Sequence, residues 1–150
     1  MLGELAPAEI EQLLRTEWVA RLGLHASRLT YVVPISYTYD GQAVIGHSAE
    51  GLKLEMLRAN PKVCVEIDQV ENLGNWRSVI AWGRFEELTG LAAADGLDQL
   101  MTRFATMMTS SATTPSHGAH PGSQHGAGPM HGCVFRIVLE EKSGRFEQQP

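Results

Sequence analysis

The stretch from Ala6 to Trp18 is the first strongly patterned segment of the chain. Pro7 suits the first turn of a helix, where its missing N–H costs no hydrogen bond. The apolar residues recur about one helical turn apart and are Ile10, Leu13, Leu14 and Trp18. The pattern predicts a short amphipathic helix, followed from about Val19 by a strand that ends near His25.

Residues 31–48 have the pattern of a β-hairpin. Two runs of β-branched and aromatic residues flank Asp40-Gly41, a dipeptide that supplies the positive φ angles of a two-residue turn. Pro34 lies in the first run and cannot donate a hydrogen bond to a neighbouring strand. We therefore expect this run at a sheet edge or irregular. It is either a plain edge strand or a strand whose unpaired backbone groups face a ligand.

The remaining pattern alternates short strands with two helices. Ser48 is the expected N-cap of a helix that carries Leu52 and Met56 on its apolar face and ends at Asn60-Pro61. We expect strands at 62–68, 75–88 and 134–141 and a second amphipathic helix at 91–108. This order predicts a mainly β fold, a closed or half-closed antiparallel β-barrel with peripheral helices.

Residues 110–132 differ in composition from the rest of the chain. They are rich in Gly, Ser, Thr, Pro and His, contain no charged residue and show no hydrophobic period, which predicts a flexible loop. Its histidines are His117, His120, His125 and His131. Their irregular spacing matches no known metal pattern, so a tolerated insertion is favoured over a metal site or a lid.

Length and charge narrow the class of protein. The chain has 150 residues, of which 43% are hydrophobic and 19% charged, which indicates a single folded domain over 1–150. A formal net charge of −5 argues against a nucleic-acid partner. No apolar run approaches the roughly 20 residues of a membrane span. The N-terminus lacks a signal-peptide pattern, and two cysteines in apolar runs fit buried free thiols. A cytoplasmic protein without a membrane or nucleic-acid partner is therefore expected.

The strongest chemical pattern is His47-Ser48-x-x-Gly51-x-Lys53, where a strand gives way to a helix. The unpaired N–H groups of a helix N-terminus attract anions. Gly51 permits close approach to the backbone, the Ser48 hydroxyl can donate a hydrogen bond, and Lys53 adds a positive charge. The pattern suits a phosphate cradle, and its alternative is a capped surface helix with a solvated lysine.

Several segments together resemble the flavin-binding relatives of pyridoxamine 5'-phosphate oxidase, especially the branch that includes the nitroimidazole-resistance proteins. Their order and spacing carry the resemblance over nearly the whole chain outside the histidine-rich loop. The segments are Arg21-Leu22-Gly23, Tyr31 to Tyr37, Gly46-His47-Ser48 with Gly51 and Lys53, Asn60 to Glu66, Trp76-x-Ser78-Val79 with Gly83, and Ser143 to Glu147.

The resemblance implies an FMN-binding split β-barrel that forms a homodimer, with FMN in grooves at the subunit interface. It implies that the 32–35 backbone lies along the isoalloxazine ring and that the cradle holds the phosphate end or the ribityl chain. It puts the 76–78 segment near the cofactor or the dimer seam. The cofactor-binding residues so implied are Val32, Val33, Pro34, Ile35, His47, Ser48, Lys53, Trp76 and Ser78.

The activity implied is that of an FMN-dependent oxidoreductase that reduces a small acceptor, with a nitroaromatic as one candidate. His47 is the candidate for proton transfer, because it is the one side chain of the cradle that ordinarily titrates near neutrality. The substrate-phosphate residues of a true pyridoxamine phosphate oxidase are not found in the last strand, so that activity is not expected. No metal is expected. The alternatives are F420 in place of FMN, or a non-catalytic flavin, haem or metal-binding protein.

Overall fold

The computed structural model describes residues 1–107 and 132–150. Its helices are α1 (Pro7–Thr16), α2 (Leu52–Ala59) and α3 (Gly90–Met107). Its strands are β1 (Leu2–Glu4), β2 (Val19–Ala26), β3 (Leu29–Ser36), β4 (Thr38–Tyr39), β5 (Ala43–Ser48), β6 (Lys62–Asn72), β7 (Asn75–Glu87) and β8 (Cys133–Gln148). All four histidines of the expected 110–132 loop lie outside the described residues.

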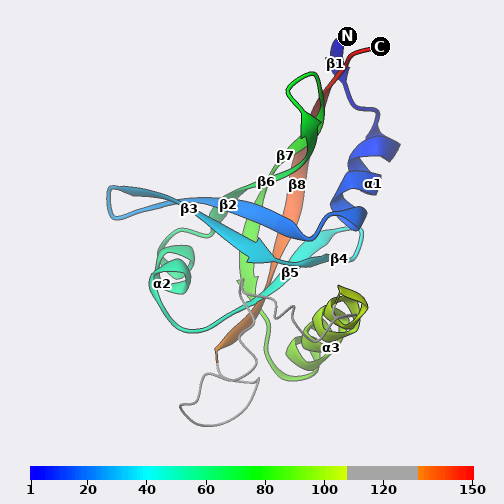
Figure 1. The fold of residues 1–150 in the computed structure, drawn as a ribbon. Helices are drawn as coiled ribbons and strands as arrows, with labels where there is room; N and C mark the ends of the chain where they lie inside the picture. Colours follow the sequence, from blue (N-terminus) through cyan, green and yellow to red (C-terminus); the bar gives the residue numbers. More distant parts are fainter. Residues whose placement is uncertain (108–131) are drawn as a thin grey trace.

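The strands form one antiparallel sheet in the order β3-β2-β6-β7-β8-β5-β4, with β1 paired to β8. The long β7–β8 ladder is its spine, and both chain ends lie at one end of this ladder (Figure 1). Helix α1 lies beside that half of the ladder, whereas α2 and α3 flank the opposite end. The sheet curls into a half-barrel with peripheral helices, which confirms the predicted mainly β fold.

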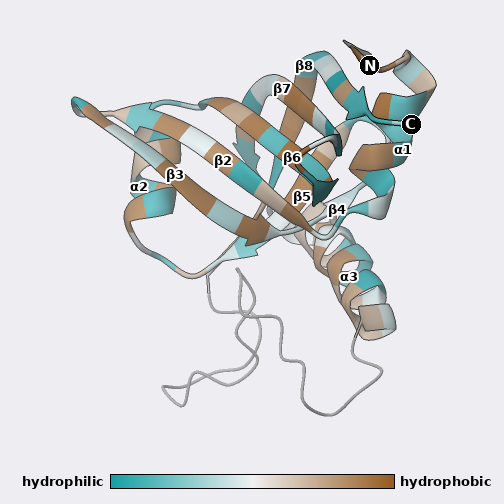
Figure 2. Ribbon diagram, turned by 45° about the horizontal axis from the view of Figure 1, so that its top comes forward, coloured by the Kyte–Doolittle hydropathy of each residue, from teal (hydrophilic) through white to brown (hydrophobic). Residues whose placement is uncertain are grey.

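The sheet curls because one of its faces is apolar. On β6, Val63, Val65 and Ile67 point into the core, while the alternate residues point to the opposite face. In Figure 2, brown hydrophobic and teal hydrophilic residues alternate along the strands of the sheet. A Cβ added to Gly46 on β5 would lie 3.4 Å from Ile35 Cδ1 on β3. Strands at opposite ends of the sheet order therefore approach each other across the core.

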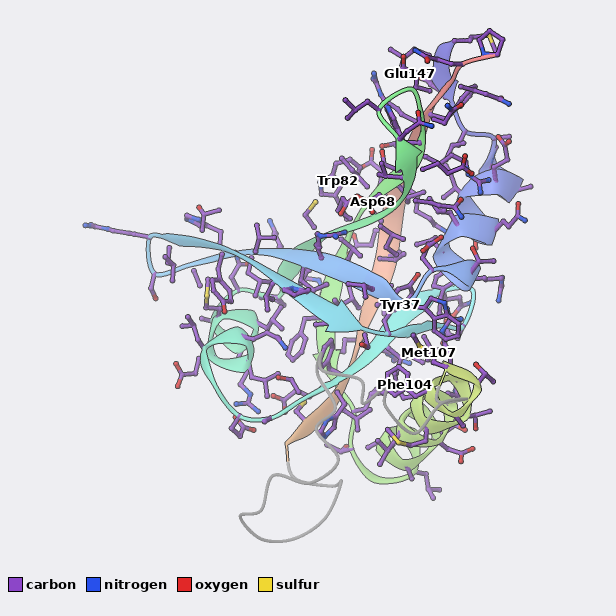
Figure 3. All side chains as sticks on the ribbon, viewed as in Figure 1. Tyr37, Asp68, Trp82, Phe104, Met107 and Glu147 are labelled. Carbon is purple, nitrogen blue, oxygen red and sulfur yellow. The ribbon has the colours of Figure 1, made fainter. Side chains whose placement is uncertain are left out.

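Helix α3 closes one end of the barrel through a second apolar cluster. Leu100 and Phe104 pack against Ile45 and Val134. Figure 3 labels Phe104 on this helix. From the same helix, the Arg103 guanidinium lies 4.2 Å from the centroid of the Trp18 ring. Within the described ranges, no helix has the length and apolar content that crossing a membrane requires.

The predicted hairpin at 31–48 differs from the structure in two respects. Its first run divides at Tyr37, so that β3 pairs with β2 and only the short β4 pairs with β5. Tyr37 is fully buried and its hydroxyl donates to the Leu14 carbonyl, which redirects the chain there. The turn is centred on Gly41 and Gln42, one residue later than expected, with φ of +98° at Gly41.

The N-terminal helix and the second amphipathic helix lie where the spacing predicts them, within two residues at each end. The last strand is longer than predicted, because β8 pairs with β7 as far as Gln148 although its second half is mostly polar. Strand β1 has only three residues, which is too few to show a period of its own.

Candidate functional site

The predicted cradle forms where β5 ends. His47 and Ser48 pair with Val134 and Cys133 on β8, and both side chains are buried, with relative exposures of 8% and 5%. Little of the His47 ring therefore reaches the surface of the chain. The next residues lead directly into α2, so that the end of a strand and the start of a helix adjoin as the sequence predicts.

Lys53 brings a positive charge to the cradle. Its Nζ lies 3.4 Å from Ser48 Oγ and donates to it. The side chain is half-buried, and burial lowers the pKa of the ammonium group from its ordinary value. Within residues 1–107 and 132–150, Lys53 forms no ion pair with a carboxylate. A half-buried cation without a protein counter-ion is favourable for binding an anion.

The helix cap differs from the prediction. Helix α2 begins at Leu52, and its N-cap is Gly51 in an extended conformation with no side-chain cap. Ser48 cannot be the cap because its backbone still belongs to β5, and its hydroxyl donates to the Ala49 carbonyl instead. A Cβ on Gly51 would meet nothing within 4 Å, so open space adjoins the backbone at the helix start.

Strand β3 is an edge strand of the sheet, as Pro34 predicts. Among the described strands β2 alone pairs with it, so every second residue of β3 directs backbone groups away from the sheet. Val32 is 65% exposed and Pro34 is exposed, whereas Ile35 is fully buried and Val33 packs partly against the core. The contact between Ile35 and the Gly46 position puts this strand next to the cradle.

Trp76 and Ser78 do not lie near the cradle within one chain. Both are at the start of β7, a 13-residue strand whose other end reaches the vicinity of α2 at Glu87. Such a strand spans roughly 40 Å at about 3.3 Å per residue. Trp76 Nε1 donates to Glu147 Oε2 at 3.2 Å, next to the chain ends (Figure 3).

The register of the strands puts the exposed residues of β3 on the same face of the sheet as Trp76 and Ser78. Val32 pairs with Gly23, Gly23 with Cys64, and Cys64 with Trp82, so these four positions form a row across the sheet. Trp76 and Ser78 alternate with core residues in the same phase as Trp82. We call this the outer face, defined by Val32, Pro34, Cys64, Glu66, Val70, Trp76, Ser78, Ile80 and Trp82.

The outer face carries apolar side chains that residues 1–107 and 132–150 leave exposed. Val70 is 60% exposed, Trp82 43% and Ile80 38%. A hollow of about 550 Å³ adjoins this face and is lined in part by His25, Lys62 and Trp82. The sequence predicted β7 as a strand with Ile80 and Trp82 on one side. Which side faces the core follows only from the register.

The cysteines and acidic residues do not form a metal centre in the described part of the chain. No group of three or more His, Cys, Asp or Glu residues is arranged to hold an ion there. Cys133 is buried, whereas Cys64 is half-buried on the outer face, and both are free thiols. Burial raises the pKa of the Cys133 thiol to about 11, which disfavours the reactive thiolate.

A curled antiparallel barrel with a cradle at one strand end defines a split-barrel protein, and comparison with known sequences identifies its family. The sequence profile of pyridoxamine 5'-phosphate oxidase matches residues 6–145. The chain therefore belongs to this family. An uncharacterized protein of Rhizobium meliloti (strain 1021), RA0666, is 36% identical over 127 residues, covering 85% of this chain and 83% of that protein.

Solved structures agree with this assignment. A FAD-binding protein from Mesorhizobium loti superposes with a TM-score of 0.72 at 27% identity, covering 99% of both chains. A protein of Bacteroides thetaiotaomicron, provisionally assigned to 5-nitroimidazole antibiotic resistance, gives a TM-score of 0.71 at 18% identity. That match covers 97% of this chain and 87% of the other, and it supports the fold alone.

Proposed function

We propose that this chain is a flavin-dependent oxidoreductase that binds FMN at the cradle. One observation carries the proposal: the half-buried Lys53 beside Ser48 has no carboxylate partner in the described part of the chain, in a family whose solved relatives include a flavin-binding protein. A phosphate monoester suits a site of this kind, because one ammonium, one hydroxyl and a helix start can all contact its oxygens.

The residues around the cradle would have separate roles. Lys53 and Ser48 would hold the phosphate, and the free edge of β3 from Val32 to Ile35 would offer backbone groups to the flavin ring. When bound, the flavin would supply the redox chemistry, taking a hydride from a nicotinamide donor and passing two electrons to a small acceptor. For the acceptor we put forward a nitroaromatic compound. His47, next to Ser48 at the end of β5, is the candidate for proton transfer.

The second part of the proposal is that two copies of the chain pair through the outer face. Val70, Ile80 and Trp82 form an exposed apolar stripe, and stripes of this kind mark protein interfaces. A two-fold axis that lies between the two faces and runs across β7 would reverse the direction of β7 between the copies. It would carry Trp76 and Ser78 of one copy toward the cradle of the other, which gives these residues a place beside the cofactor.

Flavin retention by the purified protein tests the proposal. We expect that untagged protein incubated with FMN keeps flavin absorption bands after desalting, and that these bands bleach on addition of NADH or NADPH. Binding of FAD or F420 in preference to FMN would overturn the choice of cofactor. A Soret band would favour a haem protein. Retained flavin that a nicotinamide and an acceptor never turn over would favour a non-catalytic flavin carrier.

A further inference from the structure

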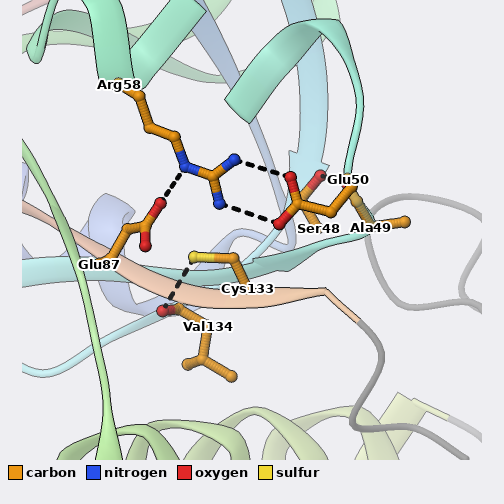
Figure 4. Close-up of polar contacts among 7 residues, drawn as sticks. All are labelled: Ser48, Ala49, Glu50, Arg58, Glu87, Cys133 and Val134. Carbon is orange, nitrogen blue, oxygen red and sulfur yellow. Dashed lines mark hydrogen bonds and ion pairs between the residues drawn. The ribbon is translucent and has the colours of Figure 1, made fainter. Parts of the chain in front are cut away.

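Three charged side chains form a network next to the cradle. Arg58, in the last turn of α2, donates from Nη1 and Nη2 to the two carboxylate oxygens of Glu50 at 2.7 and 2.9 Å (Figure 4). Its Nε donates to Glu87 at the end of β7. All three guanidinium nitrogens are thus engaged, and the paired contact with Glu50 has the fork geometry that gives such pairs directional strength.

The network ties together the parts of the chain that build the cradle. Glu50 lies in the connection between β5 and α2, two residues after Ser48 and directly before Gly51. Gly51 has no side-chain cap and no neighbour that a Cβ would touch, so the local backbone does little to fix this connection. Arg58 links it both to the far end of α2 and to the sheet through Glu87.

The network also controls charge beside the cradle. A carboxylate at position 50 without a partner would repel an anion bound at Ser48 and Lys53. Arg58 pairs with Glu50 and holds it in a direction set by the helix, while the network of one guanidinium and two carboxylates keeps a net charge of −1. In this arrangement each of its three nitrogens already donates to Glu50 or Glu87, so the guanidinium is directed at these carboxylates.

We propose that Arg58 is a positioning residue for the phosphate of the flavin: it holds Glu50 and the 49–51 connection so that Ser48 and Lys53 can take the anion. This inference rests on the proposed function, because it assumes that the cradle binds the phosphate of FMN. It assigns a role to a residue that the sequence analysis did not single out.

Riboflavin lacks the phosphate but has the same ring. Comparing how a variant binds riboflavin and FMN therefore separates an effect on the phosphate site from general damage to the fold. We expect Arg58→Ala to weaken FMN binding about 10-fold, as for loss of a favourable charge arrangement, and to leave riboflavin binding nearly unchanged. Adding Glu50→Gln to Arg58→Ala should recover part of the lost FMN affinity, because the unpaired carboxylate is gone. A merely structural role of Arg58 would not give this recovery.

Arg136→Ala is the matched control. Arg136 pairs with Glu86 at 2.7 Å and its side chain is 45% exposed, against 41% for Arg58. We expect this variant to bind FMN as the wild type does. If Arg58→Ala does not fold, Arg58→Lys replaces it, since lysine keeps the charge but cannot make the paired contact. Circular dichroism confirms that each variant is folded.

The outcomes distinguish the two proposals. A wild-type protein that binds riboflavin as tightly as FMN overturns the phosphate cradle, and this inference with it. A wild-type protein that prefers FMN, together with an Arg58 variant that keeps the full preference, overturns the inference alone. Equal weakening of FMN and riboflavin binding by Arg58→Ala overturns it as well.

Discussion

The two ends of the β7–β8 ladder differ in chemistry. At the end near α2, Lys53 is half-buried without a carboxylate partner in the described residues, and the nearby Glu50 and Glu87 are engaged by Arg58. This end suits an anion. Near this end, Ile35 of the edge strand β3 also lies against Gly46 of β5.

At the opposite end, the ladder presents aromatic and acidic side chains. A hollow of about 300 Å³ there is lined by Glu9, Glu71, Glu147, Trp76 and Phe146, among others. Its three carboxylates outnumber its one cation, Arg77, which makes this end less favourable for a phosphate than the cradle end, whereas the indole ring of Trp76 can contact an uncharged aromatic group. The comparison teaches that the anion-binding features and the Trp76 indole lie at opposite ends of the ladder, so our proposal needs a second copy of the chain to bring them to one flavin.

The largest expected effect comes from disrupting the outer face that would join two copies. We expect Ile80→Asp to convert a dimer into a monomer, with at least about a 100-fold weaker dimer and loss of FMN retention, because burying two unpaired carboxylates costs several kcal/mol. Sedimentation velocity measures the mass. Leu73→Asp is the control, since Leu73 is 92% exposed in the turn between β6 and β7. An Ile80→Asp protein that stays dimeric would place the interface elsewhere.

The next largest effect tests whether the cradle of one copy and Trp76 of the other copy contact the same cofactor. We expect Lys53→Ala to weaken FMN binding about 10- to 100-fold through loss of a charged hydrogen bond, and Trp76→Ala to weaken it less. When the two variants exchange subunits at random, half of the dimers are mixed and each mixed dimer regains one wild-type site. Tight sites should therefore reappear in about a quarter of the total.

Equilibrium dialysis of the mixture measures these sites. Arg136→Ala, which removes a cation of β8 that pairs with Glu86, is the control for the loss of charge and should bind FMN as the wild type does. Mixtures that show no tight sites would mean that Lys53 and Trp76 do not share a cofactor.

The sequence predicts the features of this comparison that depend on neighbouring residues. The helical spacing of α1, the edge position of Pro34 and the adjacency of Ser48 and Lys53 all follow from local pattern. The distance of Trp76 from the cradle does not, because it depends on the register of β7 against its neighbours. That register is fixed by which residues face the core, and side-chain alternation alone leaves both faces open.

The contacts of Arg58 also depend on residues far apart in the sequence, so they could not be predicted either. Glu50 and Arg58 are eight residues apart and Glu87 is 29 residues from Arg58. Charged residues at such separations carry no signal in a single sequence, since most of them are solvated. The break between β3 and β4 at Tyr37 could not be predicted for a related reason. The Tyr37 hydroxyl donates to the backbone carbonyl of Leu14, which belongs to another element.

The smallest expected effect is a pH dependence confined to the cradle end. Burial lowers the pKa of Lys53, so its ammonium loses its proton earlier than an ordinary lysine as the pH rises. The FMN phosphate stays doubly charged above pH ~7, since its second pKa is about 6, and it prefers the charged lysine. FMN affinity should therefore fall as the pH rises toward the lowered pKa, by about 10-fold, which is less than for Lys53→Ala because the neutral amine still donates a hydrogen bond.

Two comparisons isolate Lys53 in this measurement. Riboflavin affinity should show no matching fall, because riboflavin carries no phosphate. In Lys53→Arg the guanidinium keeps its charge over the whole range, so the FMN curve should become flat. Fluorescence titrations of both ligands across alkaline pH decide the matter. If the wild type and Lys53→Arg lose FMN affinity in parallel, the fall comes from another group, and Lys53 does not carry the charge that holds the phosphate.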